Sequence, residues 1–506
     1  MSFVTKLNSM RSTWFLVLLI LFSFAFRFVV LPLSTIHGDE YCFATTAQGI
    51  IKGFLPYSYM FEHKPFGLYY FFSSFFYLIG DNIFALRIIA IFVVFISSLF
   101  ILNFSSNKVI SLFLVLVYNF TLIGSTPEGL ASDSEIIVNM FVLGSIYYLF
   151  FSKKRFSYLV ACIFMGLSIS MNYLAIPIVF SLLLTKLIFY RSENLFYFVT
   201  GIIVVFFVNF IFYIPNYIQG DLTNVFLLQK TWLDTYRTPI IERINLKKFI
   251  ITCLRYYPIF IIVGLLFLTS FSSFKQQILS INFKIINIKY FSNKLLLSSL
   301  IILSASFASF ISTGQYWPHH FFVVLPALIF LCTVLINISS FDLVNRMIPF
   351  YVLLLISALF ITVPRFSIWG LDAWNNVLND KQPDATAELA VFLNKNTSKD
   401  ETFFMYSARN EHQGLYFLSK KKPLTKIPLW NQVTHPPYQK AFLGHDALEE
   451  FKLILEKQPK FIVIDKNLNV ELSVDKQDIF LNANLKNNYE QIENNFGIFL
   501  YRKISN

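Results

Sequence analysis

The chain has 506 residues, of which 56% are hydrophobic and only 14% are charged, and Phe alone occupies 61 positions. Soluble domains are about 25% charged, so the long uncharged runs exclude a soluble globular enzyme, and the aromatic content excludes low-complexity disorder. The formal net charge of +12 would by itself suggest a nucleic-acid partner.

The excess positive charge lies entirely in the apolar part of the chain. Residues 1–365 contain 24 Lys and Arg against 12 Asp and Glu, whereas residues 366–506 contain 17 of each sign. In membrane proteins, Lys and Arg accumulate in short cytoplasmic loops. We therefore expect the basic residues to orient membrane spans, and no nucleic-acid partner is predicted.

Apolar runs recur throughout residues 1–365. A helix needs about 20 apolar residues to cross a bilayer core. The first run is too long for a signal-peptide core and is expected to be retained. The predicted fold class is a polytopic α-helical membrane protein of about eleven spans. They lie near residues 14–33, 83–104, 109–124, 135–151, 156–170, 173–190, 195–215, 249–271, 295–312, 320–338 and 346–364.

Clusters of Lys and Arg alternate between the expected spans in a way that fits a cytoplasmic N-terminus. Residues 34–82 and 216–248 then form two long outside loops. The first loop contains an amphipathic piece at 41–52 and an aromatic, uncharged piece at 66–79 that is short for a span and suits the membrane interface. An odd number of spans places residues 366–506 outside.

The segment 366–506 is predicted to be a separate α/β domain, and residues 1–365 the membrane domain. Asp384 can cap a helix with an apolar face, and Asp446 with Glu449 forms a capping box. Three short runs are expected as strands, at 402–406, 460–465 and 497–501.

The first outside loop carries the strongest candidates for chemistry. Asp39 and Glu40 are adjacent carboxylates just beyond a span, and Glu62, His63 and Lys64 follow about 22 residues later. Ionisable groups this close to hydrocarbon are costly, which points to a function. A carboxylate there can act as a general base, and a lysine can bind a phosphate as a point charge.

Other polar groups lie at the outside ends of later spans, where ordinary capping and solvated-loop roles are the alternatives. Adjacent histidines on an α-helix point about 100° apart, so a shared metal is not predicted for them. The four cysteines form no CxxC pair and predict neither a metal site nor a disulfide framework. The additional candidates are Arg87, Asp133, Glu135, Asn172, Arg255, Tyr316, His319 and His320.

The sequence contains no Walker loop, no GxGxxG after a strand and no HExxH. This argues against a nucleotide-driven pump and against a nucleotide-sugar enzyme. The substrate is therefore expected to carry its own activation, and a polyprenyl-phosphate sugar fits because it is lipid-soluble and phosphorylated.

The order of these motifs resembles GT-C membrane glycosyltransferases of the protein O-mannosyltransferase and lipid A aminoarabinose transferase type, glycosyltransferase family 39-like. The resemblance runs from the Gly38-Asp39-Glu40 loop and the Glu62–Pro65 motif to the C-terminal region, and so covers nearly the whole chain. It implies a transferase that uses a polyprenyl-phosphate sugar. It assigns Asp39 as the base that deprotonates the acceptor hydroxyl and Lys64 as the contact to the donor phosphate. From their positions in the sequence, the supporting acids are Glu40, Glu62, Asp133 and Glu135, and the cleft includes His63, Asn172, Tyr316, His319 and His320. Arg87 and Arg255 are candidates for binding the donor phosphate, with a buried carboxylate as the alternative partner.

Two positions depart from the family pattern. Phe66 stands where a second proline is common, and Asn172 stands where a lysine is common, which puts a cationic role there in doubt.

A base on one face of the donor sugar and a phosphate leaving group on the other imply inversion of the anomeric centre. No cofactor is expected, and a divalent metal, although compatible, has no support in the residue pattern.

The predicted location is a bacterial inner membrane, with membrane lipids as neighbours and the C-terminal domain extracytoplasmic. The acceptor is left open among a glycan, a lipid and a protein. The alternatives are a flippase or transporter for a lipid-linked sugar, which would need repeated halves around a midplane site, and a non-catalytic glycan-binding membrane protein.

Overall fold

The computed structural model describes most of the chain, with gaps. The described residues are 24–25, 27–34, 36–125, 127–189, 194–236, 245–279, 287–339, 349–351, 353, 368–398, 400–406, 414–425, 445–465, 476–493 and 498–504. The expected spans at 14–33 and 346–364 therefore lie largely outside the described residues.

The chain forms two compact units. The first, here called the helical unit, comprises Met1–Phe28, Ile88–Phe212 and Thr238–Ser367. The second, here called the loop–tail unit, comprises Val29–Arg87, Tyr213–Arg237 and Ile368–Asn506. Most of both expected outside loops thus falls in one unit with the tail. The division of the sequence after residue 365 stays a prediction.

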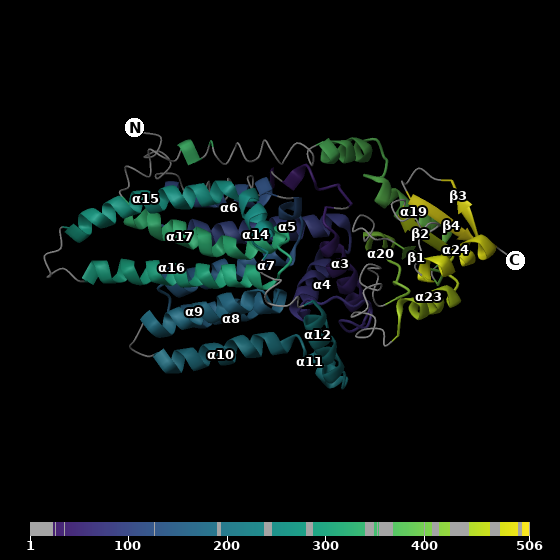
Figure 1. The fold of residues 1–506 in the computed structure, drawn as a ribbon, viewed down its shortest axis with the longest axis horizontal. Coiled ribbons are helices and arrows are strands. Elements are labelled where there is room, and N and C mark those ends of the chain that lie inside the picture. Colours follow the sequence, from purple (N-terminus) through teal and green to yellow (C-terminus); the bar gives the residue numbers. More distant parts are fainter. Residues whose placement is uncertain are drawn as a thin grey trace. The chain divides into compact units, whose positions relative to one another are not determined.

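The helical unit consists of apolar helices that run side by side in Figure 1, where α16 packs against α9 and α17, and α8 packs against α7 and α10. Helix α5 starts in the loop–tail unit and continues into this one. The elements are α5 (Ile83–Leu102), α6 (Lys108–Ser125), η1 (Pro127–Leu130), α7 (Ser134–Ile146), η2 (Tyr147–Phe151), α8 (Ser157–Met171), α9 (Ala175–Phe189), α10 (Asn194–Ile211), α14 (Leu246–Arg255), α15 (Tyr257–Leu279), α16 (Asn287–Ser312), η4 (Pro318–Val324) and α17 (Leu325–Ile338).

Four helical stretches among the described residues are long and apolar enough to cross a membrane, at Ile83–Leu102, Ser134–Phe151, Lys294–Ser312 and Pro318–Ile338. Five shorter apolar helices, α4 (Phe66–Ile79), α6, α8, α9 and α10, coincide with other apolar runs of the sequence. The expected count of about eleven spans is not confirmed, because these helices fall below the length of a span.

The run expected as one span at 249–271 is broken. Helices α14 and α15 meet at an angle of 83° and count as one span only if the bent pair is taken together. Pro258 explains the break, because proline has no N–H to donate and its ring clashes with the carbonyl four residues earlier. It is tolerated in the first turn of α15, which begins at Tyr257.

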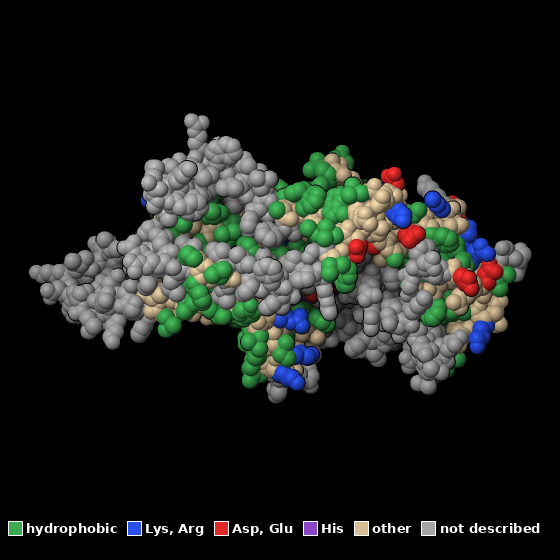
Figure 2. All heavy atoms as spheres, turned by 90° about the horizontal axis from the view of Figure 1, so that it is seen from above, with side chains coloured by type: hydrophobic (Ala, Val, Ile, Leu, Met, Phe, Trp, Pro, Cys, Tyr) green, Lys and Arg blue, Asp and Glu red, His purple; other side chains and the backbone are tan. Residues whose placement is uncertain are grey.

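Large hydrophobic side chains remain exposed on the helical unit. On α10, Phe206 is 69% exposed and Phe207 is 61% exposed. Figure 2 shows extended areas of hydrophobic side chains on the described surface. Contiguous apolar surface of this kind marks a protein or membrane contact, and with the span-length helices it favours a lipid environment.

The loop–tail unit contains short helices from both expected loops. The aromatic piece at 66–79 forms α4 (Phe66–Ile79). The piece expected at 41–52 lies in α3 (Gly38–Ile51), but its amphipathic character is not confirmed, because every residue from Glu40 to Gly49 is buried. Helices α11 (Ile214–Ile218) and α12 (Leu222–Tyr236) come from the second loop. Tyr213, which precedes α11, stacks on Phe66 with ring centroids 4.6 Å apart. Gln229 of α12 donates to the Tyr57 hydroxyl, so the two loops pack together.

The tail is α/β, as expected. Its sheet has the order β1-β2-β4-β3, with β1 and β2 parallel and the other pairs antiparallel. Three strands match the expected runs, and β3 was not predicted because its YEQI sequence has no apolar alternation. The tail elements are α19 (Ala385–Asn396), β1 (Phe403–Tyr406), α20 (Gly414–Ser419), α23 (Ala447–Glu456), β2 (Phe461–Asp465), α24 (Lys476–Asn488), β3 (Tyr489–Ile492) and β4 (Ile498–Lys503).

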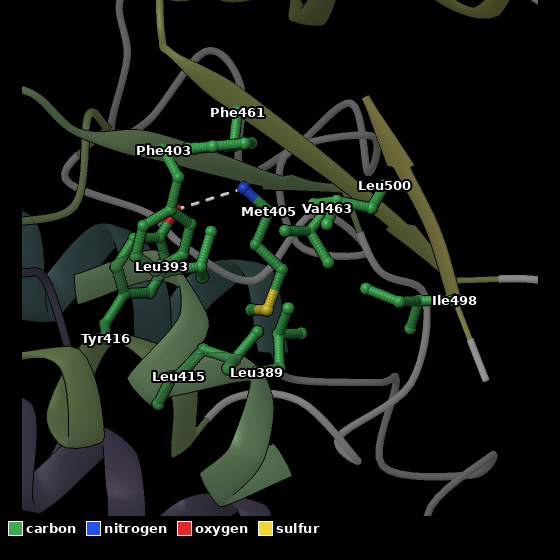
Figure 3. Packing of buried hydrophobic residues seen from close by; sticks show 11 residues of the cluster. Leu389, Leu393, Phe403, Met405, Leu415, Tyr416, Phe461, Val463, Ile498 and Leu500 are labelled. Carbon is green, nitrogen blue, oxygen red and sulfur yellow. Dashed lines mark hydrogen bonds between the residues drawn. The ribbon is translucent and has the colours of Figure 1, made fainter. Parts of the chain in front are cut away.

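Side chains that alternate along β1 build two faces. Phe403 stacks on Tyr416 of α20 at 4.8 Å between ring centroids, and the Met405 N–H donates to the Tyr416 hydroxyl (3.2 Å), as Figure 3 shows. Phe404 on the opposite face packs edge-on against Phe451 of α23. Both caps are confirmed, because Asp384 accepts from the Ala387 N–H and Asp446 from the Glu449 N–H.

The tail is joined to the first loop by hydrogen bonds. Asp384 accepts from the backbone N–H of Ser34 (2.7 Å) and also from the Ser34 hydroxyl. Gln48 of α3 donates to the carbonyl of Phe417 (3.1 Å), and Lys420 pairs with Asp81 at 2.6 Å. The cap of α19 therefore serves a second purpose, because the same carboxylate holds the segment that leads into α3.

We expect Ile498→Ala to lower the free energy of unfolding by about 2–5 kcal/mol, because Ile498 is 1% exposed in the tail core. Ile504, just beyond the same strand, is 43% exposed. Ile504→Ala is the matched control and should cost less than about 0.5 kcal/mol. Thermal unfolding of the purified protein in detergent measures both, and equal losses would contradict the assigned core.

Candidate active site

The candidate residues fall into two groups, one in each unit. The group in the loop–tail unit is Asp39, Glu40, Glu62, His63, Lys64 and Arg87. The group in the helical unit is Asp133, Glu135, Asn172, Arg255, Tyr316, His319 and His320.

Asp39 lies in the first turn of α3, together with Glu40. Acidic residues are favoured at this end of a helix because the exposed backbone N–H groups carry partial positive charge. The two neighbours differ in environment, since Glu40 is fully buried whereas Asp39 is partly exposed. Asp39 is therefore the carboxylate of this pair that a substrate can reach.

Glu40 is bound by the guanidinium of Arg87. Nη1 donates to both carboxylate oxygens at 2.7 Å, and Nη2 donates to the carbonyl of Leu33 (3.0 Å) and to the hydroxyl of Tyr41 (3.3 Å). The two side chains are 0% and 1% exposed. A pair this deeply buried fixes α3 against the first turn of α5 and against the segment before α3. The phosphate contact assigned to Arg87 stays a prediction, and the observed contacts give Arg87 a structural role.

The motif Glu62-His63-Lys64 forms a compact, mostly buried turn. Nδ1 of His63 lies 2.7 Å from Oε1 of Glu62, and Oε2 accepts from the Lys64 N–H (3.3 Å). Burial raises the pKa of Glu62, but the charges and hydrogen bonds of His63 and Lys64 outweigh it, so its net pKa is lowered. Glu62 is thus held as a carboxylate, which suits a positioning group better than a proton acceptor.

Two tyrosines that the sequence did not single out hold the backbone of this turn. The Tyr57 hydroxyl donates to the Lys64 carbonyl (2.9 Å), and the Tyr69 hydroxyl lies 3.0 Å from the Glu62 carbonyl. Gln229 of α12 donates to the Tyr57 hydroxyl (3.0 Å). Tyr57 has a φ of 70°, which is uncommon for a bulky residue and marks a locally constrained chain. Only the fold relates Gln229 to this turn, because it lies 172 residues from Tyr57.

The turn at 62–64 and the start of α3 meet around Cys42 and Phe43. Burial raises the pKa of the Cys42 thiol well above its ordinary value, and the charges of Glu62 and Asp39 raise it further. The Lys64 ammonium lies 6.0 Å from the centroid of the Phe43 ring, and Lys64 is only 5% exposed. The first turns of α3 therefore carry a partly exposed carboxylate at Asp39 and, beside Phe43, the cation of buried Lys64.

In the helical unit, Glu135 and Asn172 are brought together. The Asn172 amide donates to Oε1 of Glu135 and to the Ser134 hydroxyl, both at 2.9 Å, and the Ser134 hydroxyl donates to Oε2 of Glu135 (3.0 Å). Asp133 is buried at the N-cap position of α7 without a side-chain capping bond. The asparagine thus orients a buried carboxylate, a role that a lysine could not perform in the same way.

The segment between α16 and α17 contains Tyr316, His319 and His320. Tyr316 has a φ of 53°, and its carbonyl accepts from the Thr252 hydroxyl (2.9 Å). His319 and His320 lie in the 3₁₀ helix η4 and are buried. Arg255 is the last residue of α14, at the bend, and is exposed.

Solved structures with the same fold exist. ArnT from Cupriavidus metallidurans bound to undecaprenyl phosphate matches with a TM-score of 0.62 and 13% identity, over 98% of this chain and 99% of that one. The apo structure of ArnT from the same organism matches with the same TM-score and identity, over 97% of this chain and 98% of that one. No protein-family model and no curated protein sequence matches this chain. At this identity the match establishes a shared fold, and the predicted resemblance to the aminoarabinose transferase type is confirmed at that level.

The lowered pKa of Glu62 predicts how stability depends on pH. A carboxylate whose pKa is lower in the folded state stabilises the fold above its unfolded pKa, and this stabilisation is lost as the pH falls through the folded pKa. Melting temperatures from pH 7 down to about pH 3 should therefore fall more steeply in the wild type than in Glu62→Gln. Glu493→Gln, at an exposed position, should retain the wild-type slope. A wild-type slope in Glu62→Gln would contradict the pairing.

Removing one partner of the buried ion pair should lower the stability of the fold, whereas replacing both partners with apolar residues should not. Arg87→Ala leaves Glu40 buried without its cation and should lower the free energy of unfolding by about 3–5 kcal/mol. The double variant Arg87→Met, Glu40→Leu should recover most of this loss. Arg155→Ala, at an exposed arginine, is the control. Denaturant unfolding in detergent compares them, and a harmless Arg87→Ala would remove the structural role.

Proposed function

We propose that this chain transfers a sugar from a polyprenyl-phosphate donor to an acceptor hydroxyl. The supporting observation is the region at the start of α3, which carries the reachable carboxylate of Asp39 and, 6.0 Å from the ring of Phe43 on the same helix, the ammonium of buried Lys64. The fold shared with ArnT, whose structure contains undecaprenyl phosphate, supports a lipid-phosphate substrate. The span-length apolar helices provide the membrane setting that such a substrate needs.

In this reaction Asp39 is the base. Its carboxylate takes the proton of the acceptor hydroxyl as the hydroxyl oxygen attacks the anomeric carbon of the donor sugar. The bond between that carbon and the phosphate oxygen breaks, and its electron pair leaves with the polyprenyl phosphate. Attack opposite the leaving group inverts the anomeric centre. Positioned general bases contribute about 10²–10⁴-fold to such rates.

Lys64 is the group that binds the donor phosphate. Because Lys64 is buried, its ammonium is largely removed from water and attracts the donor phosphate more strongly than an exposed lysine would. The hydrogen bonds from Tyr57 and Tyr69 to the 62–64 backbone hold the residue in place. Because phosphate is already a good leaving group, neutralising it in this way makes a separate acid less necessary.

The same proposal gives the protein a location. It lies in a bacterial inner membrane with about eleven spans, a cytoplasmic N-terminus and residues 366–506 outside, so that Asp39 and Lys64 face the extracytoplasmic side. The excess of Lys and Arg in residues 1–365 supports this orientation. The acceptor is a glycan, a lipid or a protein that presents a hydroxyl there.

Two variants test the assigned roles. Purified protein is incubated with polyprenyl-phosphate sugars, and released polyprenyl phosphate is measured. Asp39→Asn should lower release by at least about 10²-fold while binding of undecaprenyl phosphate is kept. Lys64→Met should weaken that binding by about tenfold or more, the cost of one charge-assisted contact.

The controls keep the same chemical changes at exposed sites. The control for Asp39→Asn is Asp380→Asn. Asp380 is exposed and has a φ of 58°, a conformation that asparagine tolerates. The control for Lys64→Met is Lys395→Met, because Lys395 lies at the exposed end of α19. Both should match the wild type. Near-normal release by Asp39→Asn would overturn the base, and undecaprenyl phosphate binding without release from any donor would favour a transporter or a binding protein.

A further inference from the structure

Three buried side chains in the helical unit converge on one point that the proposed transfer reaction does not use. Glu135 comes from the first turn of α7, and His319 and His320 come from η4. One ligand atom from each of the three lies within 4.8 Å of the others. Their exposed fractions are 1%, 6% and 7%. Both segments begin stretches long enough to span a membrane, where a buried carboxylate is costly unless a cation compensates it.

The carboxylate of this cluster is held in a fixed orientation. Asn172 donates to Oε1 and Ser134 donates to Oε2, and the Asn172 carbonyl oxygen accepts from the Leu174 N–H (3.0 Å). Carboxylates that ligate metals are typically fixed by such outer hydrogen bonds, which also tune their affinity. The asparagine at the end of α8 therefore has a use beyond helix capping.

The two histidines are held by a turn rather than by a regular α-helix. Their ring centroids lie 4.5 Å apart and the rings are inclined by 77°. The His320 N–H donates to the Trp317 carbonyl (3.1 Å), and the Tyr256 hydroxyl donates to the Pro318 carbonyl (2.6 Å). Adjacent residues diverge by about 100° on an α-helix and by about 120° on a 3₁₀ helix, so helix geometry alone does not predict a shared ion. In the structure, one ring nitrogen of each histidine nevertheless lies within 4.8 Å of the other and of a Glu135 carboxylate oxygen.

We propose that Glu135, His319 and His320 bind one divalent transition-metal ion, with Zn²⁺ as the best fit. Two imidazoles and one carboxylate are the nitrogen and oxygen donors that Zn²⁺ accepts, and water or another oxygen completes a tetrahedron. Zn–N and Zn–O bonds of about 2.0–2.2 Å place ligand atoms about 3.3 Å apart, so the cluster needs only a small contraction. The ion joins the start of α7 to η4 and offsets the buried negative charge. This site does not depend on the glycosyl transfer proposed above.

Metal content tests the site directly. The full chain, with a purification tag that contains no histidine, is stripped with EDTA in detergent, incubated with Zn²⁺ alone, and desalted. Elemental analysis should find about one zinc per chain in the wild type. Glu135→Gln, His319→Ala and His320→Ala should each reduce bound zinc at least about tenfold. His445→Ala, in the tail, should retain the wild-type value.

Two further measurements keep the test informative if a ligand variant unfolds. Asn172→Ala keeps all three ligands but loses the group that orients Glu135, so its zinc affinity should fall about 10–100-fold. Co²⁺ in place of zinc should give visible d–d absorption in the wild type, and zinc should raise its melting temperature. A wild type without stoichiometric metal, or zinc retained in all three ligand variants, would overturn the site and leave a hydrogen-bonded polar cluster.

Discussion

The buried pair of Glu40 and Arg87 is the interaction on which the candidate active site depends. An unpaired carboxylate could not be buried at the start of α3, because removing a charge from water costs several kcal/mol. The guanidinium binds this carboxylate and the Leu33 carbonyl at the same time, so it fixes where α3 begins. Asp39 precedes Glu40 by one residue and points elsewhere on the helix. Burying one carboxylate therefore positions the other for a substrate.

The same constraint, that buried polar groups need partners, organises the rest of the loop–tail unit. Tyr57 and Tyr69 bind the carbonyls of the 62–64 turn, and Gln229 supports Tyr57 from the second loop. Asp384 caps α19 and also binds the segment that leads into α3. The tail thus takes part in holding the first loop.

Much of the local structure was predictable because it rests on neighbouring residues. The caps at Asp384 and Asp446 and three of the four strands follow from apolar runs and capping chemistry. The aromatic piece at 66–79 coincides with α4, whereas α3 begins three residues before the expected 41–52. The break at Pro258 is written in the sequence, but the apolar residues continue on both sides of the proline and by themselves predict one span. Strand β3 carried too few apolar residues to be recognised. The site residues were found because charges are rare near long apolar runs, and their roles stay predictions.

The sequence by itself determined that long apolar helices dominate residues 1–365, that the tail is α/β, and that Asp39, Glu62 and Lys64 are the unusual charges of the first loop. These properties depend on composition and on spacing within a few residues. Only the tertiary structure decided that Arg87 binds Glu40, that Asn172 orients Glu135, and that the two adjacent histidines converge on the same carboxylate. The partners in these contacts lie between 37 and about 185 residues apart. Nothing local to either partner specifies the other, so the choice is made by packing and by the cost of leaving a buried polar group unsatisfied.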